Sequence, residues 1–266
     1  MNASRPIPAV LSIAGSDSGG GAGIQADLKA FARCRVHGMT AITALTAQNT
    51  VGVQRVAPVA PEMIVAQVEA VASDIGVDAV KVGMLADEAT IDAVVEALGL
   101  VGDAPVVVDP VMIAQSGATL LDPNAKAALI ERILPLATVV TPNLPEARAL
   151  SGLTEGASKE ELGRAILALG PSAAVVTGGH SEDGADVLTD ASGSLRIEGP
   201  RYPDGASHGS GCTHSSALAA FLARGEELAD AARWAKEVAA EAVGNGLQAI
   251  GRGAGPVDVL GIARDT

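Results

Sequence analysis

The sequence predicts an α/β fold in which a mostly parallel central sheet is covered by helices on both faces. Short apolar runs alternate with longer stretches that have the apolar spacing of helices, and this alternation is typical of strand–helix–strand units. Most of the runs are apolar at every position, which indicates strands buried on both faces, as in parallel sheets. The expected strands are Val10–Ala14, Thr40–Thr46, Ala79–Val82, Val106–Val108, Val139–Thr141 and Ala173–Thr177.

The segments between these strands carry signals for the starts of helices. Pro61 fits the first turn of a helix, because its fixed backbone angle suits that position and its missing N–H would have no partner there. An apolar stripe follows at Ile64, Val68 and Val71. Asp122 followed by Pro123 predicts a second start, with Asp122 as the N-cap. Both helices would lie between two strands.

The C-terminal half carries further boundaries. Ser158 with Glu161 predicts a capping box, and Gly170–Pro171 ends that helix. The segment Asp186–Tyr202 is rich in glycine and turn residues, so we expect a β-hairpin at the edge of the sheet. A last long helix is expected from about residue 226 to 243.

Composition and charge restrict the class of protein. The chain has 266 residues, of which 48% are hydrophobic and 18% charged, so it can bury a sizeable core. No linker or shift in composition divides it, and we expect one domain over residues 1–266. Aromatic residues make up only 2%, so aromatic platforms for stacked bases are not expected. A net charge of −13 argues against a nucleic-acid partner, because phosphate backbones are bound by Lys and Arg.

Cysteine usage and the N-terminus predict a cytoplasmic protein. Cys34 and Cys212 are too few for a disulfide framework, so we expect free thiols in a reducing compartment. Residues 1–8 lack the charged start, apolar run and cleavage site of a signal peptide. No apolar run approaches the ~20 residues of a membrane-spanning helix, so no membrane partner is expected.

A loop of small residues, Ser207–Thr213, indicates a site for an anion. It leads into a helical pattern, and the start of a helix presents free N–H groups and the positive end of the helix dipole. Such a cradle suits a transferring phosphoryl group, although it is not a Walker A loop. Cys212 lies in the first helical turn, where the pKa of a thiol tends to fall. The same pattern also fits a plain turn with a buried cysteine.

A second polar stretch, Ala14–Lys29, follows the first strand and opens a helix. It contains Gly19-x-Gly21-x-Gly23, whose spacing differs from the G-x-G-x-x-G of dinucleotide-binding folds. We expect these glycines to let the backbone approach a flat ligand closely. A flexible connection between strand and helix is the alternative.

Acidic and amide side chains follow two further strands. Asn143 and Glu146 stand after one strand at the start of a helix, where they can orient water around Mg²⁺. Asp109 ends the preceding strand and is a second candidate partner for Mg²⁺ or phosphate. Alternatively, Glu146 only stabilises the first helical turn, and Asp109 before proline only forms a turn.

Eight segments in this order resemble the hydroxymethylpyrimidine/phosphomethylpyrimidine kinases of thiamine biosynthesis, a group within the ribokinase-like superfamily. The resemblance runs from Ser12 to about Val257 and therefore over nearly the whole chain. The segments are AGSDSGGGAGIQADLKAF, ITALTAQNT, KVGML, VVVDPVM, TPNLPEA, TGGH, HGSGCT and GRGAGPV.

The resemblance implies a fold, an activity and a set of partners. It implies a ribokinase-like fold and an ATP- and Mg²⁺-dependent enzyme, most simply a homodimer. That enzyme would phosphorylate 4-amino-5-hydroxymethyl-2-methylpyrimidine to its monophosphate and then the monophosphate to the diphosphate. By the same resemblance, Gln48 would bond the ring edge, and Met84 and Val111 would cover the ring faces. The residues matching the pyrimidine pocket are Gly15, Asp27, Gln48, Met84 and Val111.

The resemblance also assigns the phosphate side. Cys212 would accept the proton of the substrate hydroxymethyl group or help to position that group. The anion hole would comprise Gly209, Ser210, Gly211 and Cys212. The residues expected near ATP and its phosphates are Asp109, Asn143, Glu146, Thr177 and Gly179, with Glu146 and Asp109 as the metal ligands.

Three positions depart from the family pattern. Thr177 stands where many members have a lysine that could contact phosphate as a point charge. Ser210 replaces a commoner threonine, and His214 follows where an apolar residue is usual and is expected on the helix surface. The alternatives are pyridoxal kinase activity and a non-catalytic sensor of pyrimidine phosphates. An NAD-binding dehydrogenase would need the missing G-x-G-x-x-G spacing.

Overall fold

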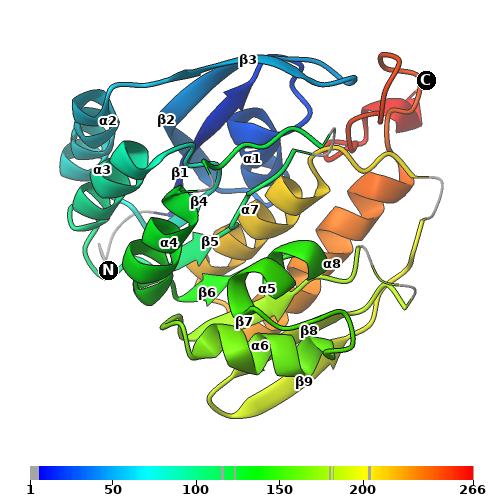
Figure 1. Ribbon diagram of the computed structural model, residues 1–266. Helices are drawn as coiled ribbons and strands as arrows, with labels where there is room; N and C mark the ends of the chain where they lie inside the picture. Colours follow the sequence, from blue (N-terminus) through cyan, green and yellow to red (C-terminus); the bar gives the residue numbers. More distant parts are fainter. Residues whose placement is uncertain are drawn as a thin grey trace.

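A single sheet of nine strands runs through the part of the chain that the structure describes. The computed structural model describes residues 6–114, 117–122, 124–179, 181, 183–202 and 205–265. The strand order is β3-β2-β1-β4-β5-β6-β7-β8-β9 (Figure 1). The bounds are β1 (Ala9–Asp17), β2 (His37–Gln48), β3 (Val53–Pro58), β4 (Ala79–Val82), β5 (Val106–Val108), β6 (Val139–Val140), β7 (Ala173–Val176), β8 (Asp186–Asp190) and β9 (Gly193–Ile197).

The centre of the sheet is parallel and both of its ends are antiparallel. β1 pairs in parallel with β2 and β4, and the parallel order continues through β5, β6 and β7. β3 adds antiparallel to β2, while β8 and β9 add antiparallel at the other end. The carboxyl ends of the parallel strands therefore meet along one edge, where such sheets bind ligands.

Helices cover both faces of the sheet, as the sequence predicts. α2, α3, α4, α5 and α6 lie on one face, and α1, α7 and α8 lie on the other (Figure 1). A π-helical turn (Leu129–Ile133) and a 3₁₀ turn (Leu134–Leu136) continue α4, and another 3₁₀ turn spans Ile262–Asp265. The bounds are α1 (Gly23–Arg33), α2 (Pro61–Asp74), α3 (Glu88–Leu98), α4 (Ala125–Ala128), α5 (Leu144–Ser151), α6 (Lys159–Leu167), α7 (Ser210–Ala223) and α8 (Leu228–Gly244).

The alternating direction of side chains along each strand fills two core layers. Leu11 and Ile13 of β1 pack into the layer beneath α2 and α3, whereas Val10 points into the layer of α1, α7 and α8. Both layers consist largely of aliphatic side chains, in keeping with the scarcity of aromatic residues. No helix in the described ranges is long and apolar enough to cross a membrane.

One strand and two element boundaries differ from expectation. β3 was not predicted, because it is an edge strand whose residues are largely exposed and lack an apolar signal. The expected hairpin is present as β8 and β9 but ends at Ile197. α4 begins at Ala125, because Asp122 instead accepts a hydrogen bond from the Asn124 N–H (2.8 Å) in a turn before the helix. Pro123 lies outside the described residues.

Candidate active site

A cavity of about 430 Å³ opens at the carboxyl ends of the parallel strands. Ligand pockets commonly measure ~300–1,000 Å³, so this one can hold small molecules. The structure brings together every site residue expected from the sequence except Asp27. The expected residues that line the cavity are Gly15, Gln48, Met84, Asp109, Val111, Asn143, Glu146, Thr177, Gly179, Gly209, Ser210, Gly211 and Cys212.

The predicted phosphate cradle is the start of α7. The helix begins at Ser210, and Gly209 is its N-cap with φ = 87°, a left-handed conformation that favours glycine. The Ser210 N–H donates to the Ser207 carbonyl (3.1 Å), and the Thr213 N–H begins the helical ladder at the Gly209 carbonyl (2.9 Å). The first-turn N–H groups at the cavity wall are therefore those of Gly211 and Cys212.

The pKa of the Cys212 thiol is higher than the sequence predicts. Burial raises its pKa to about 12, and the nearby charges of Asp27 and Asp109 act in the same direction. Lys81 and a hydrogen bond from the Gly23 backbone lower the pKa but do not outweigh burial. The expected fall in this pKa is therefore not found, because desolvation of the thiolate is the largest effect on it.

Asp27 lies behind the cavity wall and not at it. Its oxygens are 3.0 and 3.1 Å from Nζ of Lys81, and both side chains are 0% exposed. Ser12 and Ser216 also donate to the same carboxylate, at 2.6 and 2.8 Å. Asp27 is therefore absent from the cavity lining, because its oxygens are occupied by protein donors in the core, and its contact with the pyrimidine stays a prediction.

Lys81 is a cavity-lining cation that the sequence reasoning missed. It lies on β4, and the buried cation reaches the cavity beside Cys212 and Asp109. Burial disfavours its charge and is the largest single effect, but Asp27, Cys212 and Asp109 together outweigh burial and hold the pKa of Lys81 above its usual value. The available signal was a lone lysine inside the apolar strand Ala79–Val82, where a charge requires a buried partner.

Two buried carboxyl groups form the acidic part of the cavity. Burial raises the pKa of Asp109, while the charge of Lys81 opposes that rise. Burial and the neighbouring charge of Asp109 raise the pKa of Glu146 to about 8. Two carboxyl groups that disfavour each other's charge suit a divalent cation, and Mg²⁺ is commonly held by one or two carboxylates together with phosphate and water. The donor set therefore fits the expected metal.

Asn143 and Glu146 also stabilise the fold. Asn143 caps α5, its Oδ1 accepts from the Glu146 N–H (2.9 Å), and its own N–H donates to the Glu146 carboxylate (2.9 Å). A bridge from Asn143 to Thr177 ties this cap to the end of β7. Glu146 thus also stabilises the first turn of α5, which was the alternative interpretation of its position, and this capping box holds the side chains of Asn143 and Glu146 in place at the cavity.

His214 is buried, contrary to the expectation of a surface position. It is 4% exposed, and its Nε2 lies 3.2 Å from Oδ2 of Asp186. The reason is that α7 packs on the sheet with α1 and α8 against it, so that polar residues on several sides of α7 are covered. Burial alone would raise the pKa of Asp186, but His214 and Lys236 outweigh it and lower the value to about 2.

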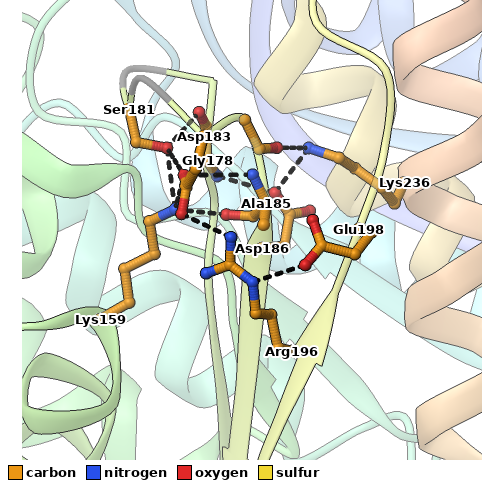
Figure 2. A network of polar contacts seen from close by, with 10 residues as sticks. Lys159, Gly178, Ser181, Asp183, Ala185, Asp186, Arg196, Glu198 and Lys236 are labelled. Atoms are coloured by element: carbon orange, nitrogen blue, oxygen red, sulfur yellow. Dashed lines mark hydrogen bonds and ion pairs between the residues drawn. The ribbon is translucent and has the colours of Figure 1, made fainter.

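Two lysines hold the connection between β7 and β8 from opposite sides (Figure 2). Lys236 donates to the Gly184 carbonyl (2.6 Å) and to Asp186 (2.8 Å). Lys159 donates to Asp183 (2.8 Å) and also to the Ala185 carbonyl. Thr177 and Gly179 begin this connection and line the cavity, so its anchoring fixes that wall.

The cavity wall formed by Gly15, Met84 and Val111, away from Thr177 and Gly179, is largely apolar. Gly15 lies against Met84, since an added Cβ would be 3.1 Å from the methionine sulfur. Val111 and Gln48 complete this wall, and Thr46 donates to Oε1 of Gln48 (3.2 Å), which orients the amide. A flat ring would find apolar cover and a fixed hydrogen-bonding group here.

The glycines of the second stretch serve close contacts within the protein. An added Cβ at Gly23 would lie 2.3 Å from the Gly15 carbonyl oxygen, and Gly23 also has φ = 57°. An added Cβ at Gly21 would lie 2.2 Å from the His208 ring. The tight packing of this loop, and not the approach of a flat ligand, explains why glycine is needed at these two positions.

Known proteins resemble this chain over nearly its whole length. Residues 17–258 match the family model described as phosphomethylpyrimidine kinase. The hydroxymethylpyrimidine/phosphomethylpyrimidine kinase of Rhizobium meliloti (strain 1021) is 48% identical over 254 residues, which cover 93% of this chain and 95% of that protein. The matched region contains the cavity-lining segments from Asp17 onwards.

Solved structures agree in fold. The pyridoxal kinase of Bacillus subtilis, solved as an ADP complex, is 37% identical with a TM-score of 0.88, covering 97% of this chain and 99% of its own. The phosphomethylpyrimidine kinase of Clostridium difficile 630 is 41% identical with a TM-score of 0.78, covering 89% and 99%. The expected ribokinase-like architecture is confirmed.

Proposed function

Because the chain belongs to the phosphomethylpyrimidine kinase family, we propose that it transfers the terminal phosphate of ATP to hydroxymethylpyrimidine and then to its monophosphate, within thiamine biosynthesis. The observation that carries this proposal is one continuous cavity. It joins the phosphate cradle at the start of α7 to the apolar wall of Met84 and Val111. A donor and an acceptor of phosphate can therefore meet inside one domain, residues 1–266.

The cavity has two halves with different chemistry. The pyrimidine lies between Met84 and Val111 with its polar edge at Gln48, and its hydroxymethyl group points towards Cys212. ATP lies on the side of Thr177 and Gly179, with its terminal phosphate at the N–H groups of the first turn of α7. Phosphoryl transfer depends mainly on positioning and on stabilising charge, which is what this arrangement supplies.

As the acceptor oxygen bonds to phosphorus and the bond from phosphorus to ADP breaks, the acceptor hydroxyl releases its proton, which passes to water or to an oxygen of the transferred phosphoryl group. Cys212 holds little negative charge near neutral pH, since burial raises its pKa to about 12. We therefore assign Cys212 to orienting the hydroxymethyl group. Loss of a general base would lower kcat by roughly 10²-fold or more. A Cys212→Ala variant that keeps more than a tenth of kcat supports the orienting role, and a larger loss supports the base.

The acidic part of the cavity suits the metal of the ATP complex. Glu146 and Asp109 would hold Mg²⁺, with Asn143 orienting its water. When bound, Mg²⁺ supplies positive charge to the ATP phosphates. Thr177 provides no charge of its own. The second transfer, in which the acceptor already carries a phosphate, therefore depends more heavily on Lys81, the buried cation beside Cys212 and Asp109.

A homodimer in the cytoplasm is also proposed. Apolar side chains are exposed at and beside the β2–β3 edge of the sheet, and an edge strand of this kind can be covered by a second copy. These side chains are Leu45, Val51, Val56 and Met63. Light scattering on wild type and on Val56→Lys tests this point, and a wild-type monomer would contradict it. Free Cys34 and Cys212 agree with a reducing compartment.

The proposed function is tested with purified protein, Mg·ATP and hydroxymethylpyrimidine, with products identified by mass spectrometry. ADP release with sequential appearance of the monophosphate and diphosphate is expected. Pyridoxal is assayed in parallel, because pyridoxal kinases share this fold. Turnover of pyridoxal alone would overturn the substrate, and binding of the pyrimidine without ADP release would indicate a sensor.

A further inference from the structure

Two loops that lie far apart in the sequence meet at the side chains of Asp17 and His208. Asp17 ends β1 and is 3% exposed, while His208 lies just before α7 and is 8% exposed. Nε2 of His208 is 3.0 Å from Oδ2 of Asp17. Both residues line the cavity, yet the transfer step described above uses neither of them.

The Asp17 carboxylate holds the loop that leads into α1. Its Oδ1 accepts from the Gly19 N–H (2.8 Å), and its Oδ2 accepts from the N–H groups of Gly21 (3.0 Å) and Ala22 (2.8 Å). Burial alone would raise the pKa of Asp17, but His208 and these N–H groups outweigh burial and lower it. The loop is therefore shaped around a charged carboxylate that also contacts His208.

The glycine loop after β1 and the loop before α7 are packed so closely that neither Gly21 nor Gly209 could carry a Cβ without a steric clash. An added Cβ at Gly21 would lie 2.2 Å from Cδ2 of His208, and one at Gly209 would lie 1.8 Å from the Gly21 carbonyl oxygen. The backbone of His208 is fixed as well. Its N–H donates to the Gly255 carbonyl (3.3 Å), and its carbonyl accepts from the Val257 N–H (3.1 Å). The His208 ring thus sets the spacing between the glycine loop and the N-cap of α7.

We propose that the Asp17–His208 pair is a positioning device that holds the acceptor side of the cavity and the phosphate cradle at a fixed separation. The proposal rests on the proposed function, in which Gly15 borders the acceptor and Gly211 borders the phosphate. Each reactant keeps its own contacts if the pair is lost, but their relative placement changes. A misplacement of about 1 Å can lower a rate by ~10²-fold, so the effect falls on kcat and not on affinity.

The test uses two substitutions of His208 and a matched control. His208→Ala removes the contact, whereas in His208→Gln the side-chain amide can still donate to Asp17 from nearly the same place. His208→Ala is expected to lower kcat roughly 10–100-fold, with KM for ATP and for the pyrimidine within about threefold, and His208→Gln is expected to recover at least half of that loss on a logarithmic scale. His37→Ala, at an exposed position where β2 begins, is expected to keep wild-type kinetics.

Three results would overturn the proposal. They are a kcat for His208→Ala within about twofold of wild type, a loss confined to one KM, and no recovery in His208→Gln. If circular dichroism shows that His208→Ala is unfolded, His208→Asn replaces it, because the shorter amide does not reach Asp17. Failure of the proposed function is distinguishable, since wild type would then form no phosphorylated pyrimidine.

Discussion

Replacing Lys81 by methionine is expected to destabilise the fold strongly, because Asp27 would remain buried without its cation. Methionine is close to lysine in length, so the change removes mainly the charge. Ser12 and Ser216 would still donate to Asp27, but both are neutral. Breaking a fully buried ion pair costs about 3–5 kcal/mol, a large share of the ~5–15 kcal/mol that stabilises a typical domain. The expected fall in Tm is roughly 10 °C.

Urea denaturation followed by circular dichroism measures this loss. Arg132→Met is the matched control, because it breaks exposed ion pairs with Glu88 and Asp92 and should change stability little. The double variant Lys81→Met/Asp27→Asn removes both charges and should be more stable than the sum of the two single losses predicts. A single variant that unfolds at the wild-type urea concentration, or strict additivity in the double variant, would refute the reasoning.

Three further predictions concern the thiols, the pH dependence and the nucleotide. Burial raises the pKa of Cys34 to about 11 and of Cys212 to about 12, so both thiols should react with iodoacetamide at pH 8 far more slowly than free cysteine. Rapid labelling of Cys212 would contradict this and would support Cys212 as the general base. Asp186 has its pKa lowered from 3.8 to about 2, so its carboxylate stabilises the fold above pH 4 and stops doing so as the pH falls towards 2. Asp186→Asn should therefore lower the free energy of unfolding by roughly 2 kcal/mol at pH 7, and urea titrations should show a smaller difference at pH 2.5; an equal difference at both pH values would be contrary to this. Thr177→Lys should lower KM for ATP several-fold, since a lysine there would add a point charge beside the phosphates, and an unchanged KM would show that the position does not reach them.

The sheet could be predicted from the sequence because its central strands are buried on both faces. Runs such as Val106–Val108 and Ala173–Val176 are apolar at every position, and their ends carry the polar residues of the cavity. β3 gave no such signal, since an exposed edge strand needs no apolar pattern. Local patterning thus predicts strands that the core stabilises, and it indicates an exposed edge strand only where turn residues mark a hairpin, as for β9.

The sequence predicts most of the residues that line the cavity, but it misses Lys81 and does not reveal the charge states. Which residues meet follows from strand ends and helix starts, but charge states depend on burial by segments distant in the sequence. The resemblance assigns Asp27 to the pyrimidine pocket, and the local sequence does not reveal its ion pair with Lys81, which lies 54 positions away. His214 was expected at the surface because the covering helices are not visible in its local pattern. Cys212 shows the same limit, since the desolvation that raises its pKa comes from burial that its local pattern does not reveal.

The most direct measurement is single-turnover transfer of ³²P from the terminal phosphate of ATP to hydroxymethylpyrimidine by wild type and by Gly209→Ala. At Gly209 a methyl group would sit 1.8 Å from the Gly21 oxygen on a backbone with φ = 87°, so the amide cradle could not keep its shape. Wild type should form labelled monophosphate, and folded Gly209→Ala should be slower by roughly 10²-fold or more. Equal rates in the two proteins would mean that the phosphate is held elsewhere.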